Sequence, residues 1–430
     1  MKSEDFKRIY IDSKKREYSP TVLENVKKCM IPFESINQFI PQGKIRRKIS
    51  IDQAVSDVNV FFDCMRLLYS GYDYFFTDEL SSQIQNNLIN KLKQKHIKHI
   101  TNEKLCRYLF QALRPFIHES HMDFISGHLY FSFAKPYIAY VSNVVVIKKD
   151  KCYQVVKGDK IFKINQIFKE DEIKDYLLPT LCPDEMKNKD DEFFLLGMYA
   201  NKKIRTFCIK NKKIKVHRIK CDFAEKHNKQ NLVEYDNYVV VNHPSYLLEV
   251  NQEKLDEFSN EGRICSKKKI TILNVAGNYG GNDYFPRNFF TAFAGSDYQN
   301  LKVAKIDIQE GDNPVKQYEI IDLGKDKSKG EYNGQLFVVM NKSTASSGEA
   351  PVAIAKNISG AIIVGSASSG CGTFGDCLSY QLPNSKIYFR LGYKLFYYDN
   401  FEEGKGWIPD FWIDDKNPVN VLEKYISIIS

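Results

Sequence analysis

The stretch that most constrains the fold of this chain is residues 335–371. An apolar run at 336–340 predicts a short buried strand, because most of its positions are β-branched or aromatic. Small and hydroxyl residues follow, and 349–356 predicts a short helix that tolerates Pro351 in its first turn. A second strand at 361–364 and a Gly-rich loop at 365–372 complete the stretch. The order strand, serine turn, helix and strand is typical of an α/β protein.

The serine turn itself has two interpretations. A hydroxyl at a strand-to-helix turn lies where the free N–H groups and the positive dipole end of a helix point. These groups can cap the helix, bind an anion or stabilise an oxyanion. On this stretch alone capping is the better interpretation, since Ser and Thr are common caps. Its hydroxyl residues are Ser343, Thr344, Ser346 and Ser347.

Length and charge restrict the function classes. At 430 residues the chain is long enough for two or three domains. The net charge of +9 comes from 62 basic and 53 acidic residues, a mild excess that gives little support for nucleic-acid binding. In the densest basic run, 201–220, Lys alternates with apolar residues, which predicts a half-buried strand with a solvated face. We therefore expect no nucleic-acid partner.

Cysteine usage and hydropathy suggest a compartment. The ten cysteines are scattered without a CxxC pair, so neither a zinc site nor a disulfide framework is predicted, and no cofactor is expected. The charged N-terminus lacks the apolar core of a signal peptide, and no apolar run would span a bilayer. A cytoplasmic protein without a membrane partner is the simplest expectation.

Four regions are predicted along the chain. Residues 1–112 form a mostly helical region, because apolar residues recur at helical spacing between 49 and 111. Residues 113–142 are strand-like, 143–228 form a small β-rich module, and 229–430 form a core in which strands and helices alternate. This alternation predicts parallel strand pairing in the core.

Two further segments carry candidate chemistry. The strand-like region contains His118, Ser120, His121 and His128, which by themselves are ordinary turn residues but which form the richest source of a base for a serine nucleophile. The buried strand at 270–275 runs into a Gly-rich turn at 276–282, where glycine lets backbone N–H groups approach a ligand closely. That turn is either a plain tight turn or an oxyanion cradle.

Together these segments resemble the family of C-terminal processing (tail-specific) proteases and the tricorn core protease, whose catalytic core has the ClpP/crotonase-like fold. Three patterns carry the resemblance: Thr-Ala-Ser-Ser-Gly-Glu at 344–349, Leu-Asn-Val-Ala-Gly-Asn-Tyr-Gly-Gly at 273–281, and Gly-Lys-Gly-Trp-Ile-Pro-Asp at 404–410. In the family the nucleophile stands three residues before the Glu, which selects Ser346. The resemblance also implies that 155–165 is similar to part of a peptide-binding PDZ module.

The chain departs from the family pattern in two places. Cys371 stands where Ser-Lys members carry their lysine, so the Ser-Lys mechanism is excluded unless another lysine reaches the serine. Asn274 and Ala276 replace the usual acidic and Arg residues of the Gly-Gly motif, although the glycines themselves remain.

Tricorn-like members instead use a Ser-His-Ser-Glu tetrad, and the resemblance implies one here. His121 would be the base, Ser120 its orienting partner and Glu403 the acid, with Glu402 as the neighbouring alternative. Gly280, Gly281 and Ser347 would supply the oxyanion hole.

The expected function is that of a serine endopeptidase or carboxy-terminal processing-type peptidase. Its partner would be a peptide or protein substrate bound in extended form, and a homo-oligomer is compatible with the sequence. The alternative is a catalytically inactive relative that binds peptides or scaffolds an assembly, which fluorophosphonate labelling distinguishes from the enzyme. A cysteine hydrolase built on Cys371 is less favoured, since that residue lies in a loop without a flanking histidine.

Overall fold

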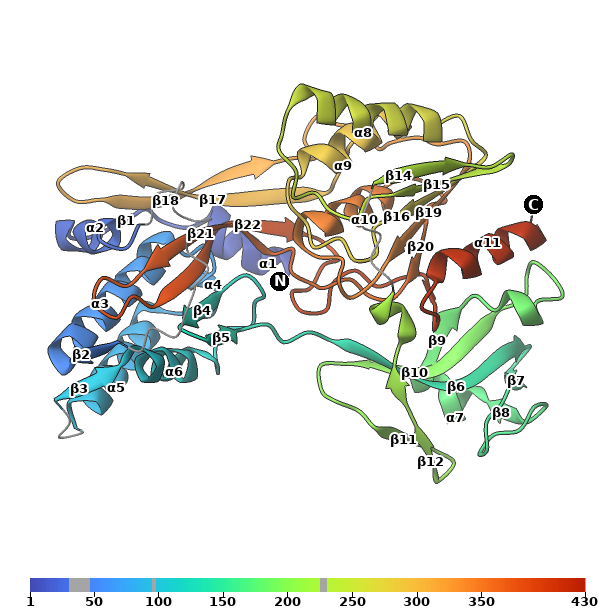
Figure 1. The fold of residues 1–430 in the computed structure, drawn as a ribbon, viewed down its shortest axis with the longest axis horizontal. Coiled ribbons are helices and arrows are strands. Elements are labelled where there is room, and N and C mark those ends of the chain that lie inside the picture. The colour runs from blue at the N-terminus through green and yellow to red at the C-terminus, as the bar shows by residue number, and fades with distance from the viewer. Residues whose placement is uncertain (31–46, 95–97, 225–229, 430) are drawn as a thin grey trace. The chain divides into compact units, whose positions relative to one another are not determined.

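The computed structural model describes residues 1–30, 47–94, 98–224 and 230–429. The chain forms two compact units, each assembled from three segments (Figure 1). Unit 1 consists of Met1–Lys135, Leu301–Leu323 and Cys371–Gly404, and unit 2 consists of Pro136–Asn300, Gly324–Gly370 and Lys405–Ser430. Two parts of the predicted 229–430 core, 301–323 and 371–404, thus group with unit 1.

Unit 1 contains an antiparallel sheet of seven strands within the described residues. Its order is β1 (Arg16–Glu17), β18 (Val315–Asp322), β17 (Leu301–Gln309), β22 (Tyr388–Tyr398), β4 (Asp123–Ser126) and β5 (Leu129–Ser132), and β21 (Phe374–Gln381) also pairs with β22. A separate small pair is formed by β2 (Lys48–Ser50) and β3 (His99–Thr101). The sheet thus joins strands from all three segments of the unit.

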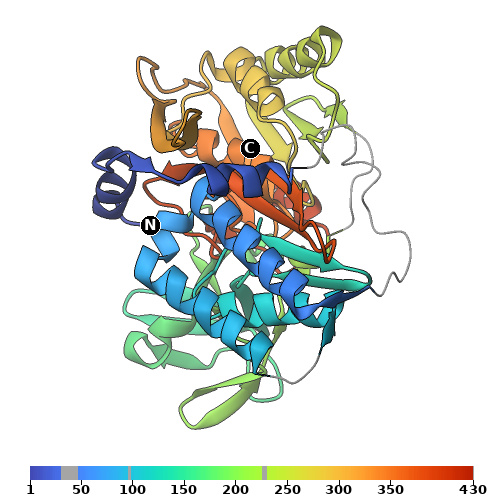
Figure 2. The same cartoon turned by 90° about the vertical axis from the view of Figure 1, so that its left-hand side faces the viewer.

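Helices cover this sheet and confirm the helical periodicity of 49–111. The long ones are α3 (Ile51–Leu68), α5 (Asp78–Lys93) and α6 (Asn102–Leu113), which lie side by side in Figure 2. Ser50 begins α3 with a capping box completed by Gln53. Phe61 of α3 packs its ring against Phe124 and Phe389 of the sheet. Shorter helices are α1 (Ser3–Phe6), a π-helix at Lys7–Ile11, α2 (Pro20–Lys27) and α4 (Tyr72–Phe75).

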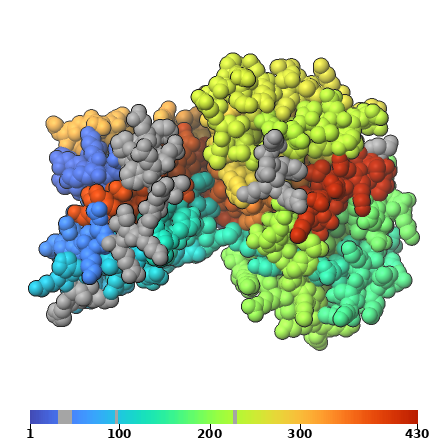
Figure 3. All heavy atoms as spheres, in the orientation of Figure 1, coloured from blue at the N-terminus to red at the C-terminus, as the bar shows by residue number. Residues whose placement is uncertain are grey.

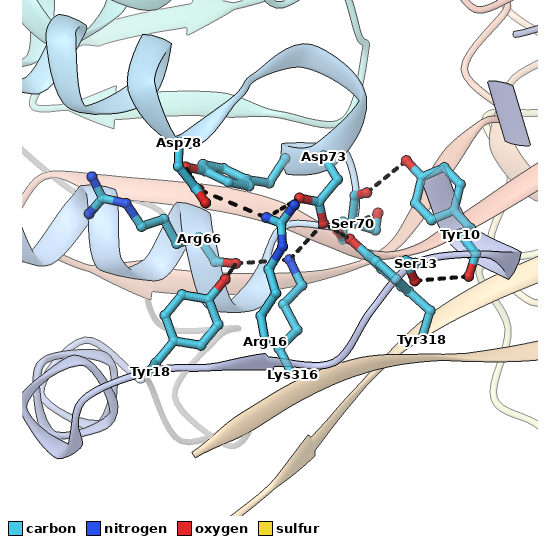
Figure 4. Close-up of polar contacts among 12 residues, drawn as sticks. Tyr10, Ser13, Arg16, Tyr18, Arg66, Ser70, Asp73, Asp78, Lys316 and Tyr318 are labelled. Atoms are coloured by element: carbon cyan, nitrogen blue, oxygen red, sulfur yellow. Dashed lines mark hydrogen bonds and ion pairs between the residues drawn. The ribbon is translucent and has the colours of Figure 1, made fainter. Parts of the chain in front are cut away.

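A buried polar network fixes the edge of this sheet (Figure 4). The Lys316 side chain is 2% exposed, donates to the Arg66 carbonyl at 2.8 Å and lies 3.5 Å from Oδ2 of Asp73. The same oxygen accepts from the Tyr318 hydroxyl at 2.6 Å, and Arg16 of β1 forms an ion pair with Asp73 at 2.5 Å. Burial lowers the pKa of Lys316 to about 8, against the opposing effect of Asp73.

Unit 2 is organised on a sheet of twelve strands within the described residues. Parallel pairing runs through β15 (Tyr238–Asn242), β16 (Ile270–Asn274), β19 (Gln335–Met340), β20 (Ile362–Gly365), β23 (Phe411–Trp412) and β9 (Leu177–Thr180). Beyond β9 the sheet continues with antiparallel pairing through β10 (Phe193–Ala200), β6 (Ile138–Lys149), β7 (Cys152–Lys157) and β8 (Ile167–Lys169). The remaining strands are β14 (Asn231–Glu234), paired with β15, and β13 (His217–Arg218), paired with β6. The chain therefore has a mixed α/β fold.

Helices α8 (Gln252–Cys265), α9 (Tyr284–Ala294), α10 (Ala350–Ala355) and α11 (Pro418–Ile429) accompany the parallel strands. The yellow-green spheres of α8 lie at the surface in Figure 3. A core of buried strand residues, including Ile272, Val339 and Val364, meets Leu422 and Ile426 of α11. The apolar strands predicted at 270–275, 336–340 and 361–364 thus lie in unit 2 with most of their residues buried.

The small β-rich part of unit 2 also contains α7 (Glu170–Ile173) and 3-10 turns at Lys174–Tyr176, Pro183–Glu185 and Lys220–Phe223. The Lys-rich run 201–220 forms the hairpin β11 (Thr206–Ile209) and β12 (Lys212–Lys215). Phe207, Ile209 and Ile214 are buried while the intervening lysines are exposed, so the predicted half-buried strand is confirmed. No helix in the described part of the chain has the length and apolarity needed to cross a membrane.

Candidate active site

Ser346 lies in the turn between β19 and α10. The turn ends in a 3-10 helix, Ser346–Glu349, which leads directly into α10, and Pro351 occupies the first turn as expected. Ser346 itself has φ of +53°, a left-handed conformation that is uncommon for a residue with a side chain. Such strain persists only where the surrounding structure enforces it, and it is frequent at functional sites.

Hydrogen bonds join the Ser346 turn to the Gly-rich turn after β16. The buried Thr344 donates its hydroxyl to the Val275 carbonyl at 2.8 Å, and the Ala345 N–H donates to the Asn278 carbonyl at 2.9 Å. The Asn341 side chain accepts from the Gly277 N–H at 3.0 Å. These contacts explain how the left-handed serine is held.

Gly280 and Gly281 lie directly against the Ser346 turn, with φ of +101° and +137°. A Cβ on Gly280 would come within 2.9 Å of Cβ of Ser346 and 3.0 Å of the Ser347 nitrogen. A Cβ on Gly281 would lie 1.9 Å from the Tyr246 carbonyl carbon. Both the backbone conformation and the available space therefore require glycine at these two positions.

The three predicted oxyanion donors differ in their hydrogen bonding. The Gly280 N–H already donates to Oδ1 of Asn278 at 2.8 Å. The N–H groups of Gly281 and Ser347 make no hydrogen bond with any described residue, whereas the Ser347 hydroxyl donates to the Gly281 carbonyl at 2.9 Å. Gly281 and Ser347 are thus the two donors that remain available.

The side chains of Glu349 and Lys342 hold the Gly-rich loop at 365–372 through hydrogen bonds. Oε1 of the buried Glu349 accepts from the Ser368 hydroxyl at 2.5 Å and from the Gly370 N–H at 2.9 Å. The Lys342 ammonium donates to the carbonyls of Ser368 and Ser369 at 2.7 and 3.0 Å. This lysine therefore supports the loop through backbone carbonyls. Cys371, which the sequence resemblance aligns with the lysine of Ser-Lys members, belongs to unit 1 and is buried.

In unit 1, the structure brings Ser120 and Glu403 together. Oε1 of Glu403 accepts from the backbone N–H of Ser120 at 3.0 Å, and Oε2 accepts from the Thr373 N–H at 3.0 Å. The neighbouring Glu402 is exposed. Glu403 is therefore the carboxylate in contact with the Ser120 segment, through the Ser120 backbone.

His121 is held in the same unit with its ring largely enclosed. Its Nδ1 atom is buried and has no hydrogen-bond partner among the described residues. Burial and, to a smaller extent, the Arg390 guanidinium lower the pKa of His121 to about 4, against the opposing effects of Asp376 and the Phe374 backbone. The imidazole is therefore neutral near pH 7, the form in which it can accept a proton.

Sequence reasoning missed Glu119, the residue before Ser120. Its side chain is fully buried; Oε2 accepts from the His121 N–H at 2.6 Å, and Oε1 accepts from the Tyr69 hydroxyl at 3.4 Å. Burial raises the pKa of Glu119 to about 7, although the backbone hydrogen bonds of His121 and Met122 oppose the shift. An acidic residue flanked by histidine and serine was the signal that could have pointed to it.

His243 of unit 2 was also missed, but its surroundings indicate a structural role. Its two ring nitrogens contact the Tyr246 hydroxyl and Oε2 of Glu261, each at 3.0 Å. The ring is fully buried against Phe258 and Phe289. His243 thus anchors the Tyr246 segment that lies beside Gly281.

The predicted site residues fall into two groups. Ser346, Ser347, Gly280 and Gly281 meet in unit 2, whereas His121, Ser120 and Glu403 meet in unit 1. No cluster of three or more metal-binding side chains occurs among the residues that the structure describes. The chemistry available to the two groups is that of a serine hydroxyl, backbone N–H donors and a neutral imidazole.

Residues 237–413 match the family model described as peptidase family S41. This region belongs to peptidase family S41. The match covers the Ser346 turn, the Gly280–Gly281 turn and Glu403, and the resemblance seen in the sequence is confirmed. The family match also confirms the prediction of a serine-type peptidase. A search of curated proteins found no match.

Solved structures with a similar course of the chain include several peptidases. A candidate peptidase from Parabacteroides merdae is 13% identical, with 89% of this chain and 97% of that chain covered and a TM-score of 0.44. Mature CPAF is 11% identical, with 88% and 95% covered and a TM-score of 0.43. The tricorn protease is 12% identical, with 88% and 37% covered and a TM-score of 0.39. With TM-scores this low, these similarities add no argument about the activity of the S41 region.

Proposed function

We propose that this protein is a serine endopeptidase or carboxy-terminal processing-type peptidase that cleaves extended peptides with Ser346 as nucleophile. The observation that carries the proposal is the left-handed Ser346 held against the Gly280–Gly281 turn within a region of peptidase family S41. A serine hydroxyl next to backbone N–H groups that can stabilise an oxyanion supports acyl transfer at this turn.

In the proposed mechanism His121 is the general base. It would remove the Ser346 hydroxyl proton as the oxygen attacks the scissile carbonyl, and then return the proton to the leaving amine. With a pKa of about 4 the His121 ring is neutral near pH 7, which is the form that can accept a proton, but it is a weaker base than an ordinary imidazole. The imidazolium would then be a strong acid toward the leaving amine.

Ser120 and Glu403 would position this base. In the proposed tetrad the Ser120 hydroxyl would turn toward Nδ1 of His121, which has no hydrogen-bond partner among the described residues. Glu403 holds the Ser120 segment through the backbone N–H at 3.0 Å. The contact of Glu403 with Thr373 at 3.0 Å gives the carboxylate a second fixed donor. Such support would keep the ring in one orientation during proton transfer.

The oxyanion would be stabilised by the N–H groups of Gly281 and Ser347. Both are without a hydrogen-bond partner among the described residues, which supports this pair over one that includes Gly280. Losing one such donor typically costs on the order of 10²–10³ in rate.

We also propose the finer features that the family resemblance implies. The parallel strands β15, β16, β19 and β20 would form a ClpP/crotonase-like core, and the strands around 155–165 would be PDZ-like. The substrate would pair its main chain along a strand edge. A cytoplasmic location and a homo-oligomeric state complete the proposal.

The decisive experiment is fluorophosphonate labelling with site identification. We expect covalent labelling at Ser346, its loss in Ser346→Ala and its strong reduction in His121→Ala, with folding retained by circular dichroism. Ser343→Ala is the matched control, because it removes a hydroxyl from the same turn. Full peptidase activity in Ser346→Ala would show that Ser346 is not the nucleophile. Absent labelling of the wild-type protein with retained peptide binding would instead identify an inactive, peptide-binding relative.

A further inference from the structure

Three large side chains are exposed around the Gly280–Gly281 turn. Leu247 is 75% exposed, Tyr279 is 53% exposed and Tyr284 is 55% exposed. We refer to these three residues as the loop patch. Single exposed apolar residues are ordinary, and these three are of interest because they surround the turn that contacts Ser346.

Backbone contacts connect the loop patch with the Ser346 turn. On one side, the Cβ direction of Gly281 points at the Leu247 nitrogen, 2.3 Å from where a Cβ would lie. On the other side, the Cβ direction of Gly280 points at Ser346, whose Cβ would be 2.9 Å away. Leu247 and Ser346 therefore flank the same two-residue turn, and Tyr279 directly precedes it.

The patch stands on a rigid base. Tyr246 forms a parallel bridge with Gly281, its N–H donates to the Gly280 carbonyl at 3.0 Å, and its carbonyl accepts from the Asn282 N–H at 2.8 Å. The Tyr246 ring is buried and its hydroxyl contacts His243 at 3.0 Å. The Tyr284 N–H donates to the Asn282 side chain at 2.9 Å. The exposed side chains are thus presented by a fixed backbone.

We propose that the loop patch binds a large apolar side chain of the substrate next to the scissile bond. The substrate class is then extended peptides with a residue such as Leu, Phe or Met at that position. This inference rests on the proposed function, because the scissile carbonyl is placed at Ser346.

The peptide is the occupant that the geometry favours. An extended chain advances about 3.3 Å per residue and points successive side chains to opposite sides. Leu247 and Ser346 flank the same two-residue turn, so a peptide whose carbonyl lies at Ser346 and whose chain runs along Gly281 would meet the patch close to the cleaved bond. Fully burying a Leu or Phe side chain contributes about 1.5–3 kcal/mol, which corresponds to roughly 10- to 150-fold in kcat/KM.

The test compares two internally quenched peptides that differ only in Leu or Ser on each side of the cleaved bond. We expect the wild-type protein to prefer the Leu peptide by about tenfold or more, and Leu247→Ser and Tyr279→Ser to remove most of this preference. Ile167→Ser is the matched control, since Ile167 is 58% exposed on β8 of the same unit. Unchanged fluorophosphonate labelling in the patch variants would show that Ser346 remains intact.

The failure of this inference differs from the failure of the proposed function. If wild type and variants show the same ratio of kcat/KM for the Leu and Ser peptides, the loop patch does not bind the substrate side chain. The proposed peptidase activity would not be affected by that result. If the wild type neither cleaves nor labels, fluorescence anisotropy with Ser346→Ala measures the affinity for the two peptides directly. Equal affinities for the two peptides would contradict binding of the substrate side chain by the loop patch. A Leu247→Ser variant that changes only the oligomeric state in solution would contradict it as well.

Discussion

At the scale of single residues, the segment around the proposed base contains two ionisable groups with opposite behaviour. Burial keeps His121 neutral, with a pKa lowered to about 4, and it keeps Glu119 protonated to higher pH, with a pKa raised to about 7. Both groups are coupled through the backbone, because Glu119 accepts from the His121 N–H. The stability of the folded segment should therefore depend on pH between these values.

Glu119→Gln tests this dependence. Because the folded pKa of about 7 exceeds the unfolded value of 4.5, the stabilisation due to the protonated form is complete below pH 4.5 and is lost as pH rises toward 7. The full effect is about 3 kcal/mol by the linkage relation. We expect Glu119→Gln, which stays neutral, to gain stability relative to wild type between pH 5 and pH 8 in urea unfolding.

The matched control for Glu119→Gln is Glu24→Gln, at an exposed position of α2. Its stability relative to wild type should hardly change between pH 5 and pH 8. A Glu119→Gln difference that is equally flat would show that Glu119 is not titrating in this range.

At the scale of elements, the site depends on two turns in close contact, and one of them can fit against the other only because it consists of glycines. The turn after β16 carries Gly280 and Gly281, and the turn after β19 carries Ser346, so that both lie at the ends of adjacent parallel strands. This placement follows from parallel pairing, because the carboxyl ends of such strands meet at one edge of the sheet. The left-handed Ser346 and the positive φ of Gly280 belong to the same contact.

Gly280→Ala should disrupt this contact. A Cβ there would lie 2.7 Å from the Ala345 carbonyl oxygen, so the Ser346 turn must move. We expect a loss of kcat/KM of about 10²-fold, since small displacements of reacting groups carry penalties of this size.

Gly295→Ala is the control, because Gly295 also has a positive φ of +73° but nothing lies within 4 Å of its Cβ direction. It should lose about 1 kcal/mol of stability through backbone strain and retain activity. Equal activity losses in the two variants would contradict the proposed role of the close contact.

At the scale of the whole molecule, the two units have separate hydrophobic cores. The core of unit 1 includes Phe61, Phe124 and Phe389, whereas the cores of unit 2 include Ile272, Val339 and Trp412. The network formed by the buried Lys316 and Asp73 with the partly exposed Arg16 belongs to unit 1 alone (Figure 4). Disturbing this network should therefore affect one unit more than the other.

Asp73→Asn tests this expectation. Removing the carboxylate leaves the 2%-exposed Lys316 ammonium without its counter-charge, and breaking such a buried pair typically costs about 3–5 kcal/mol. We expect hydrogen exchange to accelerate in α3 and β22 and to change little in β16 and β19. Asp5→Asn, at an ion pair whose partner Arg8 is 73% exposed, is the control and should be nearly neutral. Uniform acceleration in both units would show that they unfold together.

Much of the fold and half of the site follow from local sequence. The buried strands β16 and β19, the turn with Ser346 and the Gly280–Gly281 turn were predicted because a strand, a turn and a short helix are specified by neighbouring residues. The chemistry of the Ser346 turn depends on the same short stretch. Local pattern therefore predicted the turn, whereas the choice of Ser346 as the candidate nucleophile came from the family resemblance.

The remaining features depend on residues far apart in the chain. Glu403 reaches the Ser120 N–H across 283 positions, Lys316 is buried against Asp73, and 301–323 joins the sheet of unit 1 from within the predicted core. Glu119 is an ordinary acidic residue in the sequence, and only its burial raises its pKa. The sequence by itself determined which backbone turns form, because turn conformations are local. The tertiary structure decided which charges are buried and which N–H groups stay available, because desolvation and hydrogen bonding depend on what packs around each group.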